Sequence, residues 1–277
     1  MRNLKVGLVV LLLIGWGGDP HTPLHPPDSS ADELARKVIM NEAKAEASDR
    51  SHWMFRVEAV KSGKKQVKEV VESKTADLDY LLSINGRKLT AKEQRKEDQR
   101  LQELINNPDQ LRESQKAKME DFHHSQRLLT MLPEAFTYGY GEHRGDLVKL
   151  NFTPNPSFRP PSREARVFYA MEGEVWVDAR QQRLAEISGH LIHDVKFGGG
   201  LLGHLDRGGE FHVKQAEVAP GCWELIVLRI DMRGKALFFK TIAVQQYELR
   251  SEFHKVPDDL TFMQAADILR REAISDH

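Results

Sequence analysis

The sequence predicts an α+β protein that is mainly antiparallel β, and three observations support this prediction. Short segments of alternating apolar and polar residues recur through the chain, as in Glu174-Val-Trp-Val-Asp178, and this period of two is typical of strands with one covered face. Turn residues such as Asn85-Gly86 separate the segments at short intervals. Apolar residues at helical spacing are confined to the start, a charged central region and the C-terminus. Strands joined by turns this short pair antiparallel, so we expect a long meander.

The composition is that of a globular protein without a dominant charge. Of the 277 residues, 40% are hydrophobic and 29% are charged, which is enough apolar material for a sizeable core. The 40 Lys and Arg residues balance the 41 Asp and Glu residues, so the formal net charge is -1 and no basic field favours nucleic acid as a partner. The single cysteine, Cys222, excludes an internal disulfide and a cysteine-rich zinc site.

The N-terminus has the pattern of a secretory signal peptide. Arg2 and Lys5 precede an apolar run over residues 6–14, which is shorter than the ~20 residues that cross a bilayer. We expect a signal peptide over residues 1–17, followed by a flexible spacer rich in Pro and His over residues 18–29. The alternative is an uncleaved segment that tethers the protein to the inner membrane.

A helix and several strands follow the spacer and begin what we expect to be a single domain over residues 30–275. Ser30 and Glu33 have the spacing of a capping box, which predicts a helix to about Ala47. Alternation of apolar and polar residues then predicts strands over residues 52–61, 65–73 and 78–84.

A charged helical insertion covers residues 90–130. The proline in Asn106-Asn107-Pro108 removes an amide donor and predicts a break, so we expect two helices. The first has a narrow apolar stripe of Leu101, Leu104 and Ile105, and its remaining surface mixes acidic and basic residues. Interspersed charges of both signs are typical of a solvated helix face. The alternative is a charged surface that docks a partner.

The second half of the chain continues as strands with one stiff loop. Prolines within residues 153–163 exclude regular strand pairing, and we interpret this loop either as a connector or as a rim element that carries Phe158. A short helix is expected over residues 258–273. Strands are expected over residues 136–140, 147–152, 174–178, 183–195, 209–218, 222–232 and 235–249.

No motif in the sequence predicts an enzyme, a cofactor or a metal. Gly198-Gly-Gly-Leu-Leu-Gly203 matches the glycine spacing of a dinucleotide site but lacks the helix and the parallel strand that such a site needs. A bend or bulge is the better interpretation. Glu120 and His123 have the spacing of half a dimetal site, and the second half is missing. Cys222 stands in a strand beside Trp223, as a core residue does.

Large apolar side chains are abundant on the predicted strands, and few helices are expected to cover them. One interpretation is a plain core. The other is a concave face that binds acyl chains, since each buried methylene contributes ~0.8 kcal/mol. We expect the cavity candidates to share that one face. These candidates are Trp53, Phe55, Tyr80, Leu82, Val175, Val177, Trp223 and Phe238.

A set of segments in a fixed order resembles bacterial outer-membrane lipoprotein-sorting (LolA-like) proteins, most of all their larger, poorly characterised members. The resemblance covers about residues 31–256. The segments that carry it are Leu81-Leu-Ser-Ile-Asn-Gly-Arg-Lys-Leu-Thr90, Phe152-Thr-Pro-Asn-Pro-Ser-Phe-Arg-Pro-Pro-Ser162, Gly173-Glu-Val-Trp-Val-Asp178, Phe197-Gly-Gly-Gly-Leu-Leu-Gly203 and Ala236-Leu-Phe-Phe-Lys240.

The resemblance implies an unclosed antiparallel β half-barrel in the periplasm, with helices over its apolar concave side. It implies a carrier or binder of the acyl chains of lipoproteins or lipids, with no catalytic residue, no cofactor and no metal. A partner protein in the inner or outer membrane is a further expectation. The charged insertion over residues 90–130 departs from the well-studied carriers. The alternative function is an envelope interaction or sensor module in which the same half-barrel docks a protein partner.

Overall fold

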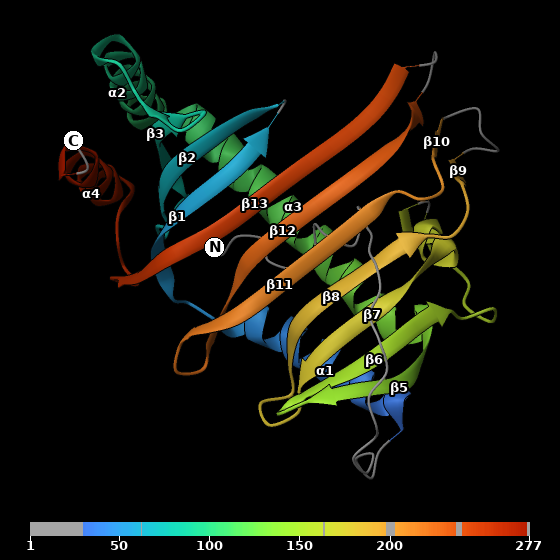
Figure 1. The fold of residues 1–277 in the computed structure, drawn as a ribbon. Coiled ribbons are helices and arrows are strands. Elements are labelled where there is room, and N and C mark those ends of the chain that lie inside the picture. The colour runs from blue at the N-terminus through green and yellow to red at the C-terminus, as the bar shows by residue number, and fades with distance from the viewer. Residues whose placement is uncertain (1–29, 62, 163, 198–202, 237–239, 276–277) are drawn as a thin grey trace. The chain divides into compact units, whose positions relative to one another are not determined.

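The computed structural model describes residues 30–61, 63–162, 164–197, 203–236 and 240–275 (Figure 1). The predicted signal peptide and spacer lie outside these residues. The described chain divides into two compact units. Unit 1 contains Ser48–His123 and the residues from Tyr247 on, and unit 2 contains residues 30–47 and His124–Gln246. Two helices and one strand have residues in both units, and the single domain over residues 30–275 stays a prediction.

Unit 1 is an antiparallel sheet with the strand order β4-β3-β2-β1-β13. Asn85 and Gly86 both have positive φ, 51° and 76°, and they form the turn after β3 that their sequence predicts. The elements are β1 (His52–Lys61), β2 (Lys64–Val71), β3 (Leu78–Ile84), β4 (Arg87–Lys88), α2 (Ala91–Asn106), α4 (Phe262–Ser275) and the C-terminal part of β13 (Lys240–Val256).

Helices α2 and α4 cover one face of the unit 1 sheet. Leu101 of α2 and Leu269 of α4 are fully buried in a cluster with Leu78 of β3. Each helix begins at a capping box. The Thr90 hydroxyl accepts from the Glu93 amide while the Glu93 carboxylate accepts from the Thr90 amide.

Helix α4 begins later than residue 258, where the sequence predicts it. The Thr261 hydroxyl accepts a hydrogen bond from the Gln264 amide, 3.3 Å, and the Gln264 side chain accepts one from the Thr261 amide, 2.9 Å. Thr261 is therefore the residue that caps the helix, and Phe262 is its first helical residue.

Unit 2 is an antiparallel sheet with the strand order β12-β11-β8-β7-β6-β5. Its elements are α1 (Ala31–Ser48, all but the last residue), the C-terminal part of α3 (Pro108–Ala135), β5 (Phe136–Arg144), β6 (Leu147–Pro154), the 3-10 helix η2 (Glu164–Ala170), β7 (Met171–Asp178), β8 (Arg183–Leu191), β9 (Val195–Phe197), β10 (Gly203–Leu205), β11 (Glu210–Ala219) and β12 (Cys222–Ala236).

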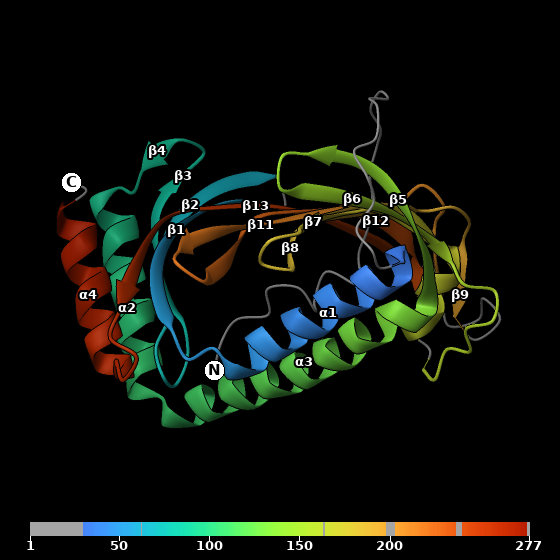
Figure 2. The same cartoon turned by 90° about the horizontal axis from the view of Figure 1, so that it is seen from below.

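One face of the unit 2 sheet carries the core. Leu150, Val175, Ile187 and Val213 lie opposite one another on four neighbouring strands and pack under α1 and the end of α3. Figure 2 shows both helices on the same side of these strands. The alternation predicted for Glu174-Val-Trp-Val-Asp178 is confirmed, because its two valines are in this core and its tryptophan is not.

The other face of the unit 2 sheet is polar and carries ion pairs between strands. Lys149 of β6 pairs with Glu174 of β7 at 3.1 Å, and His212 of β11 contacts Glu186 of β8 at 2.8 Å. A sheet with one apolar and one polar face is typical of antiparallel meanders.

The mainly antiparallel α+β class is confirmed, and the sheet is unclosed in the described residues. The strand predicted over residues 183–195 is an exception. It ends at Leu191, because the Ile192 amide donates to the Ala170 carbonyl of η2, 2.7 Å, and leaves the sheet. The half-barrel shape and its periplasmic location remain predictions.

Candidate functional site

Helix α1 covers the unit 2 core with small side chains. Its buried apolar residues include Ala31, Ala35 and Ala43, and only Leu34, Val38 and Ile39 among them are large. An alanine buries little apolar area, so each turn of α1 contributes less packing free energy than a leucine-rich turn would. Apolar contacts alone therefore hold α1 on the sheet less strongly than they would hold a leucine-rich helix.

Polar contacts also hold α1 against the unit 2 sheet. Glu42 is only 4% exposed, and its Oε1 accepts from the Nε of Arg183, 2.6 Å, and from the amide of Leu184, 2.9 Å. Its Oε2 accepts from the Nη2 of Arg183, 3.2 Å, and from the Nε2 of Gln215, 3.4 Å. A buried carboxylate with several donors is stable only while all of them stay in place. Glu42 therefore ties α1 to β8 and β11.

Two further polar contacts attach α1 on the N-terminal side of Glu42. The Asn41 side chain donates to the Gln182 carbonyl at 3.3 Å, and the Asp32 carboxylate accepts from the Tyr138 amide at 2.8 Å. Burial, and then the charge of Asp32, raise the pKa of the Tyr138 hydroxyl above its usual range. Its proton therefore stays on at neutral pH and donates to the Leu132 carbonyl, 3.1 Å.

Three of the predicted cavity residues lie in unit 2, and they belong to two separate clusters. Val175 and Val177 are buried beneath α1 and α3. Trp223 packs with Trp176 and Ala185 in a separate cluster. Trp223 therefore does not pack with the two valines. That the predicted residues line one cavity stays a prediction.

The predicted cavity residues of unit 1 also divide between two faces. Tyr80 and Leu82 are buried under α2 and α4. Trp53 and Phe55, each 2% exposed, alternate along β1 with Met54, which packs against that same α2 and α4 cluster. Trp53 and Phe55 therefore point to the other face. The period of two predicted these strands, but it cannot tell which face a helix covers. Phe238 lies outside the described residues.

The face of Trp53 and Phe55 contains two residues that the sequence reasoning missed. The ring of Phe253 stacks on Phe55, with centroids 5.2 Å apart, and meets Trp53 edge-on at 6.4 Å. The guanidinium of Arg250 lies 5.1 Å from the centre of the Phe55 ring. Glu248 and Arg250 are two residues apart in a strand, so their side chains lie on the same side of it, and they form an ion pair of 2.5 Å. Opposite charges at this spacing are the one feature of the sequence that could have indicated the position of Arg250.

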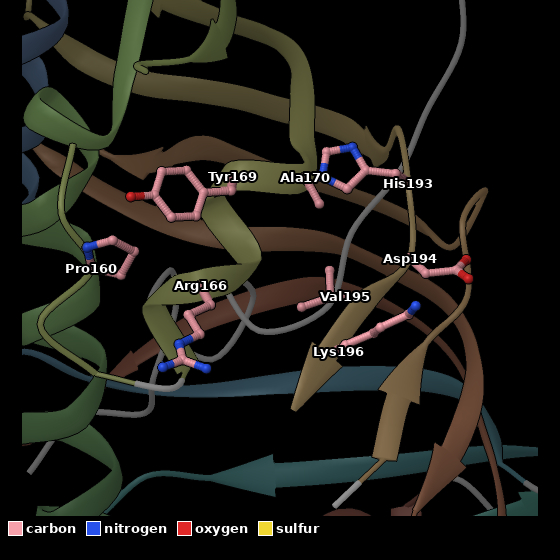
Figure 3. Close-up of a pocket in the computed structure, with 8 residues that line it drawn as sticks. All are labelled: Pro160, Arg166, Tyr169, Ala170, His193, Asp194, Val195 and Lys196. Atoms are coloured by element: carbon pink, nitrogen blue, oxygen red, sulfur yellow. The ribbon is translucent and has the colours of Figure 1, made fainter. Parts of the chain in front are cut away.

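A pocket of about 400 Å³ opens at the end of the unit 2 core (Figure 3). Ala170 and Val195, which line it, are buried members of that core. Its other lining residues come from the Pro-rich loop, η2 and the chain around β9, and they are Pro160, Arg166, Tyr169, His193, Asp194 and Lys196.

The Pro-rich loop forms one side of this pocket, and its aromatic residue is part of the core. Phe158 is 8% exposed and packs against the rings of Phe168 and Tyr169, both 6.2 Å away. The Tyr169 hydroxyl donates to the Phe158 carbonyl, 2.5 Å. The loop is therefore fixed at the edge of the apolar face by its own aromatic side chain, which favours the rim interpretation over a plain connector.

The predicted absence of a metal and of a catalytic motif is not tested by this structure. No cluster of His, Cys, Asp and Glu suited to a metal ion occurs among the described residues. In the same part of the chain, no helix combines the length and the apolar character needed to cross a membrane.

Comparison with known proteins finds one distant structural likeness. No protein-family profile and no curated protein match the sequence. Among solved structures, the chain is similar to a DUF1329 family protein from Desulfovibrio piger ATCC 29098, with 9% sequence identity over 82% of this chain and 93% of that chain and a TM-score of 0.27. A likeness at this TM-score carries no argument about function.

Proposed function

We propose that the protein binds the acyl chains of a lipid or a lipidated protein on the apolar face of the unit 2 sheet, beneath α1, and carries them in the periplasm. The observation that supports this most is the composition of the α1 contact. Three alanines and only three large apolar side chains make up its buried apolar surface, so a bound chain can replace these contacts. The half-barrel architecture implied by the resemblance is part of the proposal.

Free energies are compatible with such an exchange. Burying Leu34, Val38 and Ile39 contributes roughly 1.5–3 kcal/mol for each side chain. An acyl chain contributes ~0.8 kcal/mol for each methylene it buries. About ten methylenes therefore offset the loss of the large apolar contacts of α1, and a membrane acyl chain is longer than that. A ligand of this class therefore offsets the apolar part of the cost of moving α1, and the hydrogen bonds of Glu42 must be broken in addition.

A disulfide across the α1 contact tests this proposal. Asn41→Cys and Gln182→Cys, in a Cys222→Ser background, place two thiols where the Asn41 side chain now contacts the backbone of Gln182, 3.3 Å. The reduced protein is expected to take up a fluorescent fatty acid, and the oxidised protein is expected to take up at least about tenfold less. Reduction by dithiothreitol should restore uptake in the same sample.

The matched control is a disulfide that leaves α1 free. Thr137 of β5 lies opposite Thr153 of β6, and their hydroxyls are 3.1 Å apart. The pair Thr137→Cys and Thr153→Cys, in the same background, should form a disulfide without changing uptake. Equal uptake by the oxidised and reduced forms of the 41–182 pair would contradict binding beneath α1. Failure of the reduced protein to bind any acyl probe would contradict the proposed function altogether.

The alternative of a docking module has weaker support. Several charged residues of α2 that would form its surface already pair within unit 1, as Glu93 does with Arg87 of β4 at 2.8 Å and Arg100 with Glu97 at 2.7 Å. Side chains already paired in this way are typical of a solvated helix face.

A further inference from the structure

We propose that the pocket beside η2 binds a phosphate-type anion, the head group of the ligand whose acyl chain lies on the unit 2 core. The link to an acyl chain rests on the proposed function, whereas the anion site itself rests on the pocket alone. The apolar side chains that line the pocket and its charged rim belong to one continuous region, so one amphipathic molecule can occupy both.

The pocket joins apolar and polar surfaces. Ala170 and Val195 line it and are also part of the core beneath α1, with 1% and 5% exposure. Figure 3 shows Val195 between Arg166 and Lys196, with Ala170 beside His193. A ligand that places a charged group at the rim therefore has apolar side chains directly next to it. This arrangement suits the junction between a head group and an acyl chain.

The cationic groups of the rim are exposed and unpaired. Among the residues that the structure describes, no carboxylate lies within ion-pair distance of Arg166 or Lys196. Elsewhere in unit 2 the pattern differs, since Lys149 pairs with Glu142 at 3.0 Å and Lys214 with Glu186 at 3.6 Å. Cations without a partner keep their full attraction for a ligand anion.

The one carboxylate in the pocket is already hydrogen-bonded. Asp194 Oδ1 accepts from the Arg207 amide at 2.8 Å, which holds the side chain towards the turn between β10 and β11. Figure 3 shows this carboxylate pointing away from Arg166. The rim thus carries the permanent charges of Arg166 and Lys196 against one carboxylate.

A phosphate group fits this donor set better than a carboxylate does. A guanidinium donates two parallel hydrogen bonds to phosphate oxygens, and an ammonium acts on the same group as a point charge. A phosphate monoester has three terminal oxygens and more than one negative charge near neutral pH, so Arg166 and Lys196, which both line the pocket, each attract it. The cavity of about 400 Å³ is large enough for such a group with its glycerol or sugar.

Two probes separate a free anion from a lipid head group. The first is inorganic phosphate, titrated by isothermal calorimetry at low ionic strength. The second is a set of phosphatidylcholine vesicles with and without phosphatidic acid, measured by co-sedimentation. Wild-type protein is expected to bind the phosphatidic acid vesicles more tightly than the pure phosphatidylcholine vesicles, and to lose that preference as salt is raised.

The test variant is Arg166→Ala with Lys196→Ala. Each cation removed should weaken binding of the anionic probe by about tenfold, the effect of one charge-assisted hydrogen bond at an exposed site. The control variant, Lys44→Ala with Arg127→Ala, removes the same charge from exposed residues of α1 and α3. It should bind like the wild type.

The outcomes are distinct for the two proposals. Equal binding of both probes by the wild type and by the Arg166 and Lys196 variant would overturn the anion site. Loss of phosphate binding in that variant, with no preference of the wild type for phosphatidic acid vesicles, would overturn the lipid source and leave a site for a soluble phosphate compound. A wild-type protein that binds phosphate but takes up no fatty acid would contradict the acyl function alone.

Discussion

The carboxylate of Glu42 in α1 is joined to the guanidinium of Arg183 in β8 by hydrogen bonds of 2.6 and 3.2 Å, although 141 residues separate them in the chain. Arg183 also lies 5.7 Å from the centre of the Trp223 ring. The ion pair is the main polar contact between the cover helix and the sheet of unit 2, and it is almost completely buried. Its strength therefore sets how readily α1 can leave the apolar face.

Glu42→Ala should lower the free energy of unfolding of the protein by about 3–5 kcal/mol. Removing one partner leaves the guanidinium of Arg183 and the amide of Leu184 buried without an acceptor, and that penalty exceeds the value of the pair itself. Urea unfolding followed by tryptophan fluorescence measures the change.

Two companion variants make the Glu42 result specific. Lys37→Ala removes an exposed charged side chain of the same helix, whose distance to Glu33 is 3.9 Å, and should change stability by less than about 0.5 kcal/mol. Glu42→Leu with Arg183→Met replaces the whole pair by apolar side chains and should recover most of the loss. A double variant as unstable as Glu42→Ala would show that the pair is not what fixes α1.

Gly173→Ala should destabilise unit 2 strongly, by several kcal/mol. A Cβ at this position would meet the backbone oxygen of Ser188 and lie 2.9 Å from Cζ of Phe152, so the strands β7 and β8 would have to separate. Gly139→Ala in β5 is the matched control, because a Cβ there meets nothing within 4 Å. That control is expected to be neutral or slightly stabilising. Thermal unfolding compares the wild type with the two variants. A similar melting temperature for Gly173→Ala and Gly139→Ala would contradict the close approach of Gly173 to the backbone of β8.

The sequence predicted where helices, strands and turns begin and end much better than it predicted which face of a strand a helix covers. The capping box at Ser30, the turn at Asn85-Gly86 and the break before Pro108 are local signals, and the structure has a helix start, a turn and a helix boundary at each. Thr90 and Glu93 form a second capping box, and their spacing in the sequence is a local signal of the same kind. Local hydrogen bonds decide such features, so a single sequence reports them.

The candidate site could not be predicted in the same way. Glu42 reads as an ordinary acidic residue of an amphipathic helix, because its partners Arg183 and Gln215 are distant in the sequence. The division of Trp53 from Tyr80 between two faces depends on where α2 and α4 pack, which alternation within one strand does not encode. The pocket rim combines three chain segments, and only the fold brings Arg166 near Lys196.

The contact between Glu186 and His212 should make stability depend on pH in the acid range. The hydrogen bond from the His212 ring, 2.8 Å, lowers the pKa of Glu186, although burial opposes the shift and Lys214 adds to it. A carboxyl whose pKa is lower in the folded state stabilises the fold above its unfolded pKa of about 4.3, and this contribution is lost as the pH falls through the folded pKa. The advantage of the wild type over Glu186→Gln should therefore shrink as the pH is lowered from about 6 to about 3.

Urea unfolding at several pH values measures this difference. Glu210→Gln, which removes an exposed carboxylate from the neighbouring strand β11, controls for the change in net charge. A stability difference between wild type and Glu186→Gln that stays constant across the acid range would exclude the linkage.

Phe55→Ala should lower the free energy of unfolding by about 3–5 kcal/mol, because the ring is 2% exposed and its removal leaves a cavity. The lost ring also ends the stacking with Phe253 and the contact with Arg250, whose buried guanidinium would then face an empty space. Val60→Ala on the same strand, at a position 38% exposed, should cost less than about 1 kcal/mol. Urea unfolding gives both values. If Phe55→Ala proved as mild as Val60→Ala while acyl uptake fell, the Phe55 side chain would belong to a ligand cavity in unit 1 instead of the core, and the site would have to be placed there.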